Sequence, residues 1–317
     1  MLNAAVVGVG NMGRHHARIY SELSDVELIA VCDSNEKIAK EIASKFNCKH
    51  YVDYKKMLSN EKIDIVSIAI PTIMHKEAAL DFLNKKIHVL LEKPICKTVE
   101  EAECIIKSAK NNGVILSVGH IERYNPGVIR IKKMIDDGIF GDIISIDAKR
   151  VGVYPSQIKD SDVVVDVAIH DIDIINYLYG DFPEKVFSNK GVAIGTHRAD
   201  YVDILLTYGK KSGSIQCNWI TPVKIRTLAV TGTKAYAELN YMTQELKLFK
   251  TTITRKTDNF GDFIFLFGKP EIDTIQINVE EPLKNEISNF VNAVLKKEKL
   301  RITAEEATKA LEIALKI

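Results

Sequence analysis

The segment VVGVGNMGRHH, residues 6–16, joins a short apolar run to a helical pattern. It contains the spacing GxGxxG, with glycines at positions 8, 10 and 13. Between a strand and a helix, the first glycine permits a tight turn, the second lets backbone approach a pyrophosphate, and the third lets helix and strand pack closely. The helix N-terminus adds N–H groups and a positive dipole that favour phosphate. The segment predicts a dinucleotide-binding βαβ unit, and the alternative is a tight turn without a ligand.

Asp33 stands at the end of the second apolar run, 20 residues beyond Gly13. A carboxylate at this position can accept hydrogen bonds from both ribose hydroxyls of an adenosine, whereas a 2′-phosphate would be repelled. This favours NAD over NADP. Two alternatives stay open: Asp33 could cap the next helix, since DSN is good capping chemistry, and Arg14 or Lys37 could reach a phosphate.

Length and composition limit the class of protein. A chain of 317 residues exceeds the size of one hydrophobic core, so two domains are expected. The 43 basic and 42 acidic residues nearly cancel and are spread along the chain, so we expect neither a nucleic-acid nor a membrane partner. The chain begins on a strand-like run without a signal region, which favours a cytoplasmic protein. Its five cysteines form no CxxC pair, which indicates reduced, structural thiols and no metal site.

Hydrophobic periodicity divides the chain into two parts. The first part alternates predicted strands with predicted helices, which is typical of a parallel sheet. The second part has long alternating runs with turns around residues 209–213 and near 232, which predict a mostly antiparallel sheet. We therefore predict a domain of residues 1–120 and another of 121–317, with helices in 284–317 packing back. The predicted strands are 3–7, 26–32, 64–70, 88–91, 114–119 and 143–153; the predicted helices are 12–23, 35–46, 75–84, 99–111 and 128–136, followed by two in the tail, the second capped by Thr303.

Two further loops follow strands of the first part. One contains Pro71, Thr72 and His75, and the other contains Glu92 and Lys93 in the sequence LLEKPI. In a doubly wound sheet the ligand crevice lies along the carboxyl ends of the strands. These loops are candidates for that crevice, although a lysine at a strand end can equally be a solvated surface charge.

The segment DVAIHDIDII, residues 166–175, places acids and a histidine in an apolar helical pattern. At about 100° per residue, Asp166, His170, Asp173 and Tyr177 fall on one narrow stripe. Buried ionisable groups are costly unless they are paired or line a cavity. A polar cleft is the leading interpretation, and a satisfied core network is the alternative.

The combination of GVGNMGRHHA, EKP and D-x-x-x-H-D-I-D resembles the glucose-fructose oxidoreductase and inositol dehydrogenase family, written Gfo/Idh/MocA, over essentially the whole chain. The resemblance implies a Rossmann doubly wound parallel sheet plus an α/β domain with a large, mostly antiparallel open sheet that forms a homodimer or homotetramer. It implies a catalytic group of Lys93, Asp166 and His170, and a cis Lys93–Pro94 bond. The cofactor-binding positions would be Gly8, Gly10, Asn11, Met12, Gly13, Asp33, Pro71, Thr72, His75, Glu92 and Lys93.

These residue types suit the oxidation of a secondary alcohol by NAD. Histidine has an ordinary pKa near ~6.5, so His170 can accept the hydroxyl proton at neutral pH. Lys93 is the rival base and can orient the same hydroxyl, while Asp166 can hold Lys93 or a sugar hydroxyl. Asp173 and Tyr177 are either supporting residues or purely structural.

Within the family, VGHIERYNP at residues 118–126 resembles the branch that oxidises nucleotide-linked amino sugars. It implies oxidation of UDP-N-acetylglucosamine to its 3-keto form. Alternatives are a dehydrogenase of a free polyol such as inositol, and a regulator that senses NAD(H) without turnover. The candidate substrate-binding residues are Arg123, Asn125, Tyr154 and Asp166, with Lys149, Arg150 and Lys159 as further cations that could meet a diphosphate or be surface charges.

Overall fold

The protein is described from a computed structural model covering residues 1–154, 161–194, 197–251, 253–257, 260 and 263–317. The chain divides into two compact units. The first comprises Met1–Tyr124 and Glu281–Leu315, and the second Asn125–Glu280 and Lys316–Ile317. The tail helices therefore belong to the first unit.

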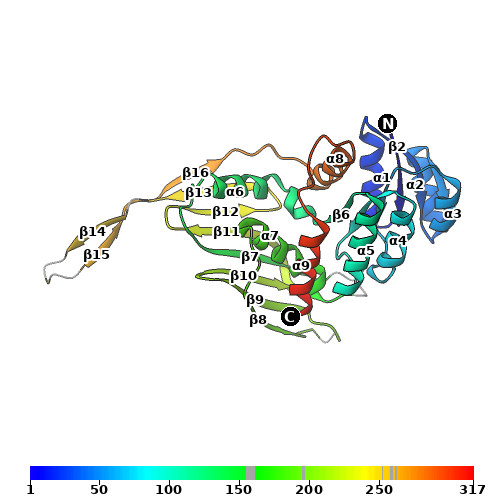
Figure 1. Ribbon diagram of the computed structural model, residues 1–317. Helices are drawn as coiled ribbons and strands as arrows, with labels where there is room; N and C mark the ends of the chain where they lie inside the picture. The colour runs from blue at the N-terminus through cyan, green and yellow to red at the C-terminus, as the bar shows by residue number, and fades with distance from the viewer. Residues whose placement is uncertain (155–160, 195–196, 252, 258–259, 261–262) are drawn as a thin grey trace. The chain divides into compact units, whose positions relative to one another are not determined.

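The first unit is built on a six-stranded parallel sheet in the order β3-β2-β1-β4-β5-β6 (Figure 1). The order reverses between β1 and β4, and ligands of such sheets bind outside the carboxyl ends of the strands at this point. Its strands are β1 (Leu2–Val7), β2 (Val26–Cys32), β3 (Lys49–Tyr51), β4 (Ile65–Ile68), β5 (His88–Glu92) and β6 (Leu116–Gly119). Its α-helices are α1 (Gly13–Glu22), α2 (Glu36–Phe46), α3 (Tyr54–Asn60), α4 (His75–Asn84), α5 (Val99–Asn112), α8 (Pro282–Val294) and α9 (Ala304–Leu315).

Local sequence signals account for several helix ends. Thr98 accepts a hydrogen bond from the Glu101 amide at 3.3 Å, and the Glu101 carboxylate accepts one from the Lys97 amide at 3.2 Å. Thr303 caps α9 as predicted, since its hydroxyl accepts from the Glu306 amide at 3.2 Å. The sequence missed β3 and α3, because runs of 3 and 7 residues are too short to show a period.

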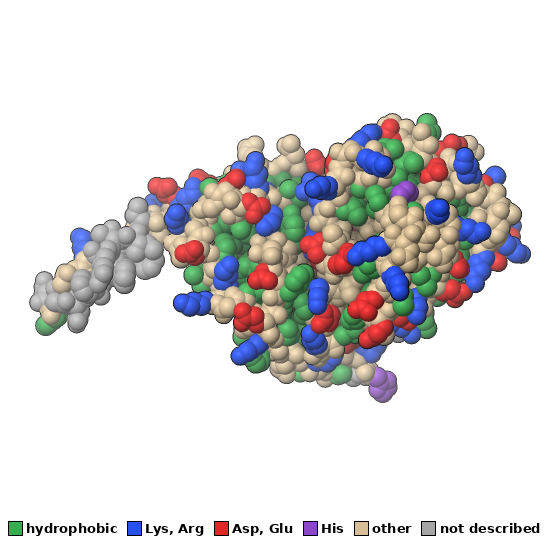
Figure 2. Space-filling view, in the orientation of Figure 1, with side chains coloured by type: hydrophobic (Ala, Val, Ile, Leu, Met, Phe, Trp, Pro, Cys, Tyr) green, Lys and Arg blue, Asp and Glu red, His purple; other side chains and the backbone are tan. Residues whose placement is uncertain are grey.

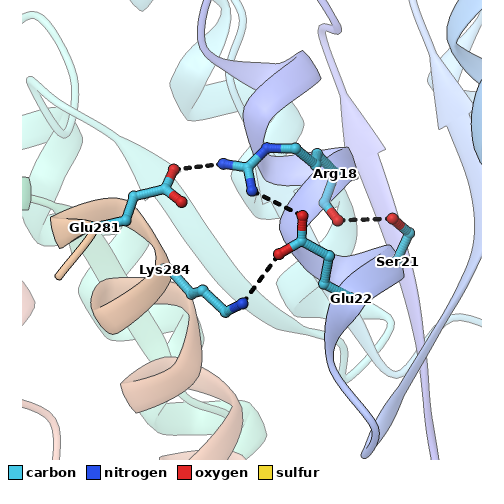
Figure 3. Close-up of polar contacts among 5 residues, drawn as sticks. All are labelled: Arg18, Ser21, Glu22, Glu281 and Lys284. Atoms are coloured by element: carbon cyan, nitrogen blue, oxygen red, sulfur yellow. Dashed lines mark hydrogen bonds and ion pairs between the residues drawn. The ribbon is translucent and has the colours of Figure 1, made fainter.

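Helix α8 joins the first unit mainly through apolar packing against α1. Leu283, Ile287 and Phe290 lie in the same buried cluster as Ile19 and Tyr20. At the surface, Arg18 bonds both Glu281 and Glu22, and Lys284 bonds Glu22 at 3.0 Å (Figure 3). Because such exposed ion pairs contribute about 0–1 kcal/mol each, the apolar contact supplies most of the docking energy.

The second unit is built on an eight-stranded sheet in the order β16-β13-β12-β11-β7-β10-β9-β8. All neighbouring strands run antiparallel except β7 and β10, which confirms the predicted mostly antiparallel sheet. The strands are β7 (Ile143–Val153), β8 (Lys185–Gly191), β9 (Tyr201–Tyr208), β10 (Lys211–Asn218), β11 (Ile220–Gly232), β12 (Tyr236–Asn240), β13 (Glu245–Lys250) and β16 (Glu271–Ile275), while β14 (Ile253–Thr257) and β15 (Phe263–Phe267) form a separate hairpin. The helices are α6 (Pro126–Asp136) and α7 (Ile169–Tyr179), with a π-turn at Val164–Ala168.

One face of the eight-stranded sheet is covered by α6 and α7 (Figure 1). The fit is close: a Cβ on Gly213 of β10 would lie 2.8 Å from Ile175 of α7, and one on Gly127 of α6 would lie 2.3 Å from Leu239 of β12. The opposite face of the sheet exposes apolar side chains to solvent. Phe187 of β8 pairs with Leu205 of β9, and these side chains are 55% and 43% exposed.

Charged side chains of both signs are intermixed on the face shown in Figure 2. This agrees with the even balance of charge along the sequence. Within the described ranges, no helix combines the length and apolar character needed to cross a bilayer.

Glu286 on α8 is a buried acid in the core of the first unit. It is 1% exposed, and among the described residues neither carboxylate oxygen has a hydrogen-bond partner. Burial, and then the charge of nearby Glu92, raise its pKa well above the usual range of a glutamate. Burial therefore favours the neutral carboxylic acid form of this side chain in the folded protein.

The substitution Glu286→Gln should remove a pH dependence of stability. Glu286 is ionised in the unfolded chain above its ordinary pKa but protonated in the folded one, so its contribution to stability is full at acid pH and falls as pH rises toward the raised pKa. In urea unfolding, the variant should equal the parent near pH 4 and exceed it by more than about 1 kcal/mol at pH 8, since a tenfold change in proton affinity corresponds to about 1.4 kcal/mol.

The matched control is Glu27→Gln, which neutralises an exposed glutamate of β2 in the same unit. It should leave the pH dependence unchanged. A difference between parent and Glu286→Gln that is the same at both pH values would show that folding does not raise the pKa of Glu286.

Candidate functional site

The glycine loop between β1 and α1 leaves room for a ligand at one position. Gly8 has φ +82°, and a Cβ there would lie 2.4 Å from the Ala69 carbonyl oxygen. A Cβ on Gly13 would lie 1.7 Å from the Gly8 oxygen, so both positions require glycine for the fold itself. Gly10 is exposed, and a Cβ there would meet nothing within 4 Å. Its missing side chain therefore leaves open space beside the N-terminus of α1, as a pyrophosphate requires.

Asn11 and Met12 are exposed in the same turn, immediately before α1. Their backbone lies where the first N–H groups of the helix have no partner inside it. Backbone N–H groups at such a helix end suit a phosphate.

Asp33 lies just beyond the carboxyl end of β2 and shapes this loop. Its carboxylate accepts hydrogen bonds from the Val9 amide at 3.0 Å and from the Asn35 amide at 2.9 Å. Asn35, rather than Asp33, caps α2, accepting from the amides of Lys37 and Ile38 at 3.1 and 3.3 Å. The half-exposed Asp33 carboxylate keeps lone pairs for ribose hydroxyls. These residues fit an NAD molecule, which the glycine loop and Asp33 would hold.

His75 joins the loops after β4 and β5. Its Nε2 lies 2.8 Å from the Ile70 carbonyl oxygen, while Nδ1 lies 3.0 Å from that of Pro94. The ring is buried, and burial lowers its pKa. His75 therefore lies between the exposed Pro71 loop and the loop that contains Lys93, and the single N–H of its neutral ring can donate to one of the two carbonyl oxygens. The Lys93–Pro94 bond is cis, as the family resemblance implied.

Glu92 anchors the backbone of Lys93 through a buried polar chain. Its carboxylate accepts from the Lys93 amide at 3.2 Å and lies 3.0 Å from His16 Nε2. His16 Nδ1 lies 3.0 Å from the Ser67 hydroxyl, which lies 2.8 Å from that of Tyr20. A neutral His16 satisfies every group if Tyr20 donates to Ser67, Ser67 to Nδ1, and Nε2–H to Glu92. Burial alone raises the pKa of Glu92, but the His16 hydrogen bond and the Lys93 charge lower it on balance, so it is a carboxylate.

The sequence did not identify His16 or Ser67 as supporting residues. The only local signals are a histidine three residues after Gly13 and a serine inside the buried strand β4. Neither signal indicates which residue the side chain bonds, because His16 and Glu92 are 76 residues apart in the chain.

In the second unit, Asp166 and His170 stand at the junction of the π-turn and α7. The prediction of one regular helix through residue 166 is wrong here, since Val164–Ala168 is a π-helix and α7 begins at Ile169. The wider π-turn changes the angle between successive side chains, so a wheel at 100° per residue does not relate Asp166 to His170. Both side chains are half-buried. Asp162 starts the turn by accepting from the amides of Val164 and Val165 at 3.0 and 3.1 Å.

The neighbouring Asp171 forms a buried ion pair with Arg150 of β7. Arg150 Nε and Nη2 donate to its two carboxylate oxygens at 2.9 and 2.8 Å. The guanidinium also lies 5.0 Å from the centre of the Tyr241 ring. Arg150, which the sequence offered as a substrate contact, therefore has a structural partner. Of the other residues on the predicted stripe, Asp173 is buried and Tyr177 lies under Lys132 at 5.9 Å.

Asp166 lines a pocket of about 410 Å³ that lies within the second unit. Tyr154 contacts one of the lining residues, since its ring lies edge-to-face on Trp219 at 5.5 Å, and its hydroxyl lies 3.3 Å from Arg198. Lys149 is exposed on the other face of β7, and Lys159 lies outside the described residues. The lining residues are Arg150, Val151, Gly152, Val153, Asp166, Val167, Asn218, Trp219, Lys224 and Arg226.

Two predicted substrate residues have structural roles instead. Arg123 is 1% exposed and donates to the Arg301 carbonyl and the Glu306 carboxylate, both at 3.1 Å. Asn125 is buried and caps α6, accepting from the Gly127 amide at 2.9 Å. The polar atoms of both residues therefore bond other parts of the protein.

No group of three or more His, Cys, Asp or Glu side chains within the described ranges could hold a metal ion. All five cysteines are free thiols.

Known proteins resemble the chain over most of its length. It is 26% identical over 294 residues to UDP-N-acetylglucosamine 3-dehydrogenase of Acidithiobacillus ferrooxidans, covering 92% of this chain and 88% of the relative. A solved structure of that enzyme superposes with a TM-score of 0.86 at 24% identity, covering 99% of this chain and 96% of the other. Inositol 2-dehydrogenase of Salmonella typhimurium is 27% identical over 185 residues, which cover 57% of this chain and 55% of that protein.

The fold also matches levoglucosan dehydrogenase in complex with NADH and L-sorbose, with a TM-score of 0.84 at 19% identity over 99% of this chain and 96% of that one. Residues 2–120 match the oxidoreductase family, NAD-binding Rossmann fold, and residues 128–238 match the GFO/IDH/MocA C-terminal domain. The chain belongs to the Gfo/Idh/MocA family of NAD-binding oxidoreductases.

Proposed function

We propose that this oxidoreductase oxidises a secondary ring hydroxyl of a UDP-linked sugar, converting UDP-N-acetylglucosamine to its 3-keto form. The observation that carries the proposal is the bracing of the Lys93 loop in the same unit as the glycine loop. Glu92, which is linked through His16 to Ser67, accepts from the Lys93 amide, and His75 Nδ1 lies 3.0 Å from the Pro94 carbonyl oxygen. Such support requires polar groups to be buried, which costs free energy. It is therefore expected where a side chain must be positioned for chemistry. The choice of sugar follows the relative that matches nearly the whole chain.

Three residues have proposed roles: Lys93 in the first unit, and Asp166 and His170 in the second. Bound NAD supplies the acceptor for the hydride that leaves the sugar carbon. His170 accepts the proton of the reacting hydroxyl, because a neutral imidazole is a suitable base near pH 7. Lys93 orients that hydroxyl through its ammonium group, and Asp166 accepts a hydrogen bond from a neighbouring sugar hydroxyl. Lys93 is the rival proton acceptor.

Two other functions remain as alternatives. A regulator that only senses NAD(H) would need the glycine loop and Asp33, but not the braced Lys93 or the polar turn at Asp166. A dehydrogenase of a free polyol would need groups that bind hydroxyls but no cations. The pocket beside Asp166 contains Lys224 and Arg226, which favours an anionic substrate over a free polyol.

The substrate assignment predicts NAD reduction when the purified protein is mixed with UDP-N-acetylglucosamine. The rate should exceed that with myo-inositol by at least about tenfold, the effect of about 1.4 kcal/mol of extra transition-state binding. NADP should be the poorer acceptor, because Asp33 repels its 2′-phosphate. Absorbance at the NADH band measures both comparisons. Turnover of myo-inositol without turnover of the nucleotide sugar would refute the assignment.

The base assignment predicts that His170→Ala lowers kcat by roughly 10²–10⁴-fold. NAD affinity, measured by calorimetry, should stay nearly unchanged, since His170 is assigned to the substrate rather than the cofactor. His50→Ala, which removes an exposed histidine of the first unit, is the matched control and should leave kcat intact. If His170→Ala turned over near the parent rate, the proton acceptor would have to be Lys93 or another group.

We also propose that the protein is a homodimer or homotetramer that pairs through the open face of the eight-stranded sheet. Exposed Phe187 and Leu205 on this face support the proposal, because paired apolar side chains are costly in water. Light scattering should give a multiple of the 35.5 kDa chain, and Leu205→Glu should shift the mass toward one chain. A monomeric parent would contradict the proposal.

A further inference from the structure

Three cationic side chains line the pocket beside Asp166, namely Arg150, Lys224 and Arg226. Arg226 of β11 pairs in register with Arg150 of β7, so both side chains leave the same face of the sheet. Asp171 matches the charge of Arg150 through two hydrogen bonds. Lys224 and Arg226 then face the pocket with Asp166 as the one carboxylate among the described lining residues.

The walls of the pocket leave space next to these cations. Gly152 of β7 carries no side chain opposite Lys224, and a Cβ there would come no closer than 3.8 Å to the Lys224 stem. Val151 and Trp219 give an apolar wall, and both are buried. The volume of about 410 Å³ lies in the range of small-molecule sites, roughly 300–1,000 Å³.

The two ends of the pocket suit two different chemical groups. A guanidinium can bind two phosphate oxygens at once, and an ammonium adds a compact positive charge, so Arg226 and Lys224 suit a diphosphate. The carboxylate of Asp166 accepts hydrogen bonds and suits a sugar hydroxyl. A free polyol would use only the second group, whereas a nucleoside diphosphate sugar would use both.

We propose that Arg226 and Lys224 form the diphosphate subsite of the enzyme, binding the phosphates of a nucleoside diphosphate sugar whose ring lies toward Asp166. This inference rests on the proposed function for the identity of the substrate. It assigns specificity to two residues of β11 that the sequence patterns did not single out.

The test uses the full-length protein and the variants Arg226→Gln and Lys224→Gln. Each should raise the Kd for UDP, measured by calorimetry, and the KM for UDP-N-acetylglucosamine by roughly 10–100-fold, the effect of losing a charge-assisted hydrogen bond. The kcat should change by less than about threefold. The affinity for uridine, which lacks phosphate, should not respond to either substitution. Arg226→Lys should recover part of the UDP affinity, because it restores the positive charge without the guanidinium that binds two oxygens at once.

The matched control is Lys149→Gln, which removes a cation from the opposite face of the same sheet. It should leave the Kd for UDP and the KM unchanged, and circular dichroism should show the same fold in all variants. Equal losses of UDP affinity in Lys149→Gln and Arg226→Gln would show that UDP binding responds only to the overall charge of the protein, and would overturn the subsite.

The outcomes separate this inference from the proposed function. UDP binding that depends on Arg226 in a protein that does not oxidise UDP-N-acetylglucosamine would support the subsite and refute the function. Oxidation with an unchanged KM and an unchanged UDP Kd in both variants would support the function and overturn the subsite. A fall in kcat without a change in KM would show that Arg226 acts on Asp166 rather than on phosphate, which also overturns it.

Discussion

The close approach of Gly13 to Gly8 is the contact on which the rest of the first unit depends. A side chain at Gly13 would place its Cβ 1.7 Å from the Gly8 oxygen, so α1 can begin against the end of β1 only without one. Because α1 begins there, its residue His16 reaches Ser67 of β4 and Glu92 of β5. The contact that shapes the pyrophosphate loop thus also sets the anchor of Lys93.

Buried charged side chains are stabilised differently in the two units. In the second, Arg150 and Asp171 are both buried and satisfy each other with two hydrogen bonds, which offsets the cost of removing them from water. In the first, Glu92 stays ionised because His16 and the Lys93 amide bond it, while Glu286 avoids the cost by holding its proton. Glu92 thereby bonds the backbone of Lys93, whereas Glu286 is expected to make the stability of the first unit depend on pH.

The elements that sequence patterns predicted are those with a long period or a strong cap. Strands β1 and β2 and helices α4 and α5 lie within one or two residues of their predicted bounds. The short elements β3 and α3 were missed, and the π-turn before α7 was read as regular helix, because one extra residue in a turn leaves no mark on an apolar pattern. Arg123 shows the same limit for a side chain: its carboxylate partner Glu306 is 183 residues away, so nothing near Arg123 indicates that its charge is used internally.

Motifs confined to a few neighbouring residues could therefore be predicted from the sequence alone. Each such motif lies within one loop or helix end of the folded protein. The motifs are the glycine spacing, Asp33, the EKP loop and His170, four residues after Asp166. The bridge from Ser67 through His16 to Glu92, and the register that sets Arg226 opposite Arg150, arise only on folding. They join residues from different strands and helices, and strand order and register depend on the packing of the whole sheet rather than on any one segment.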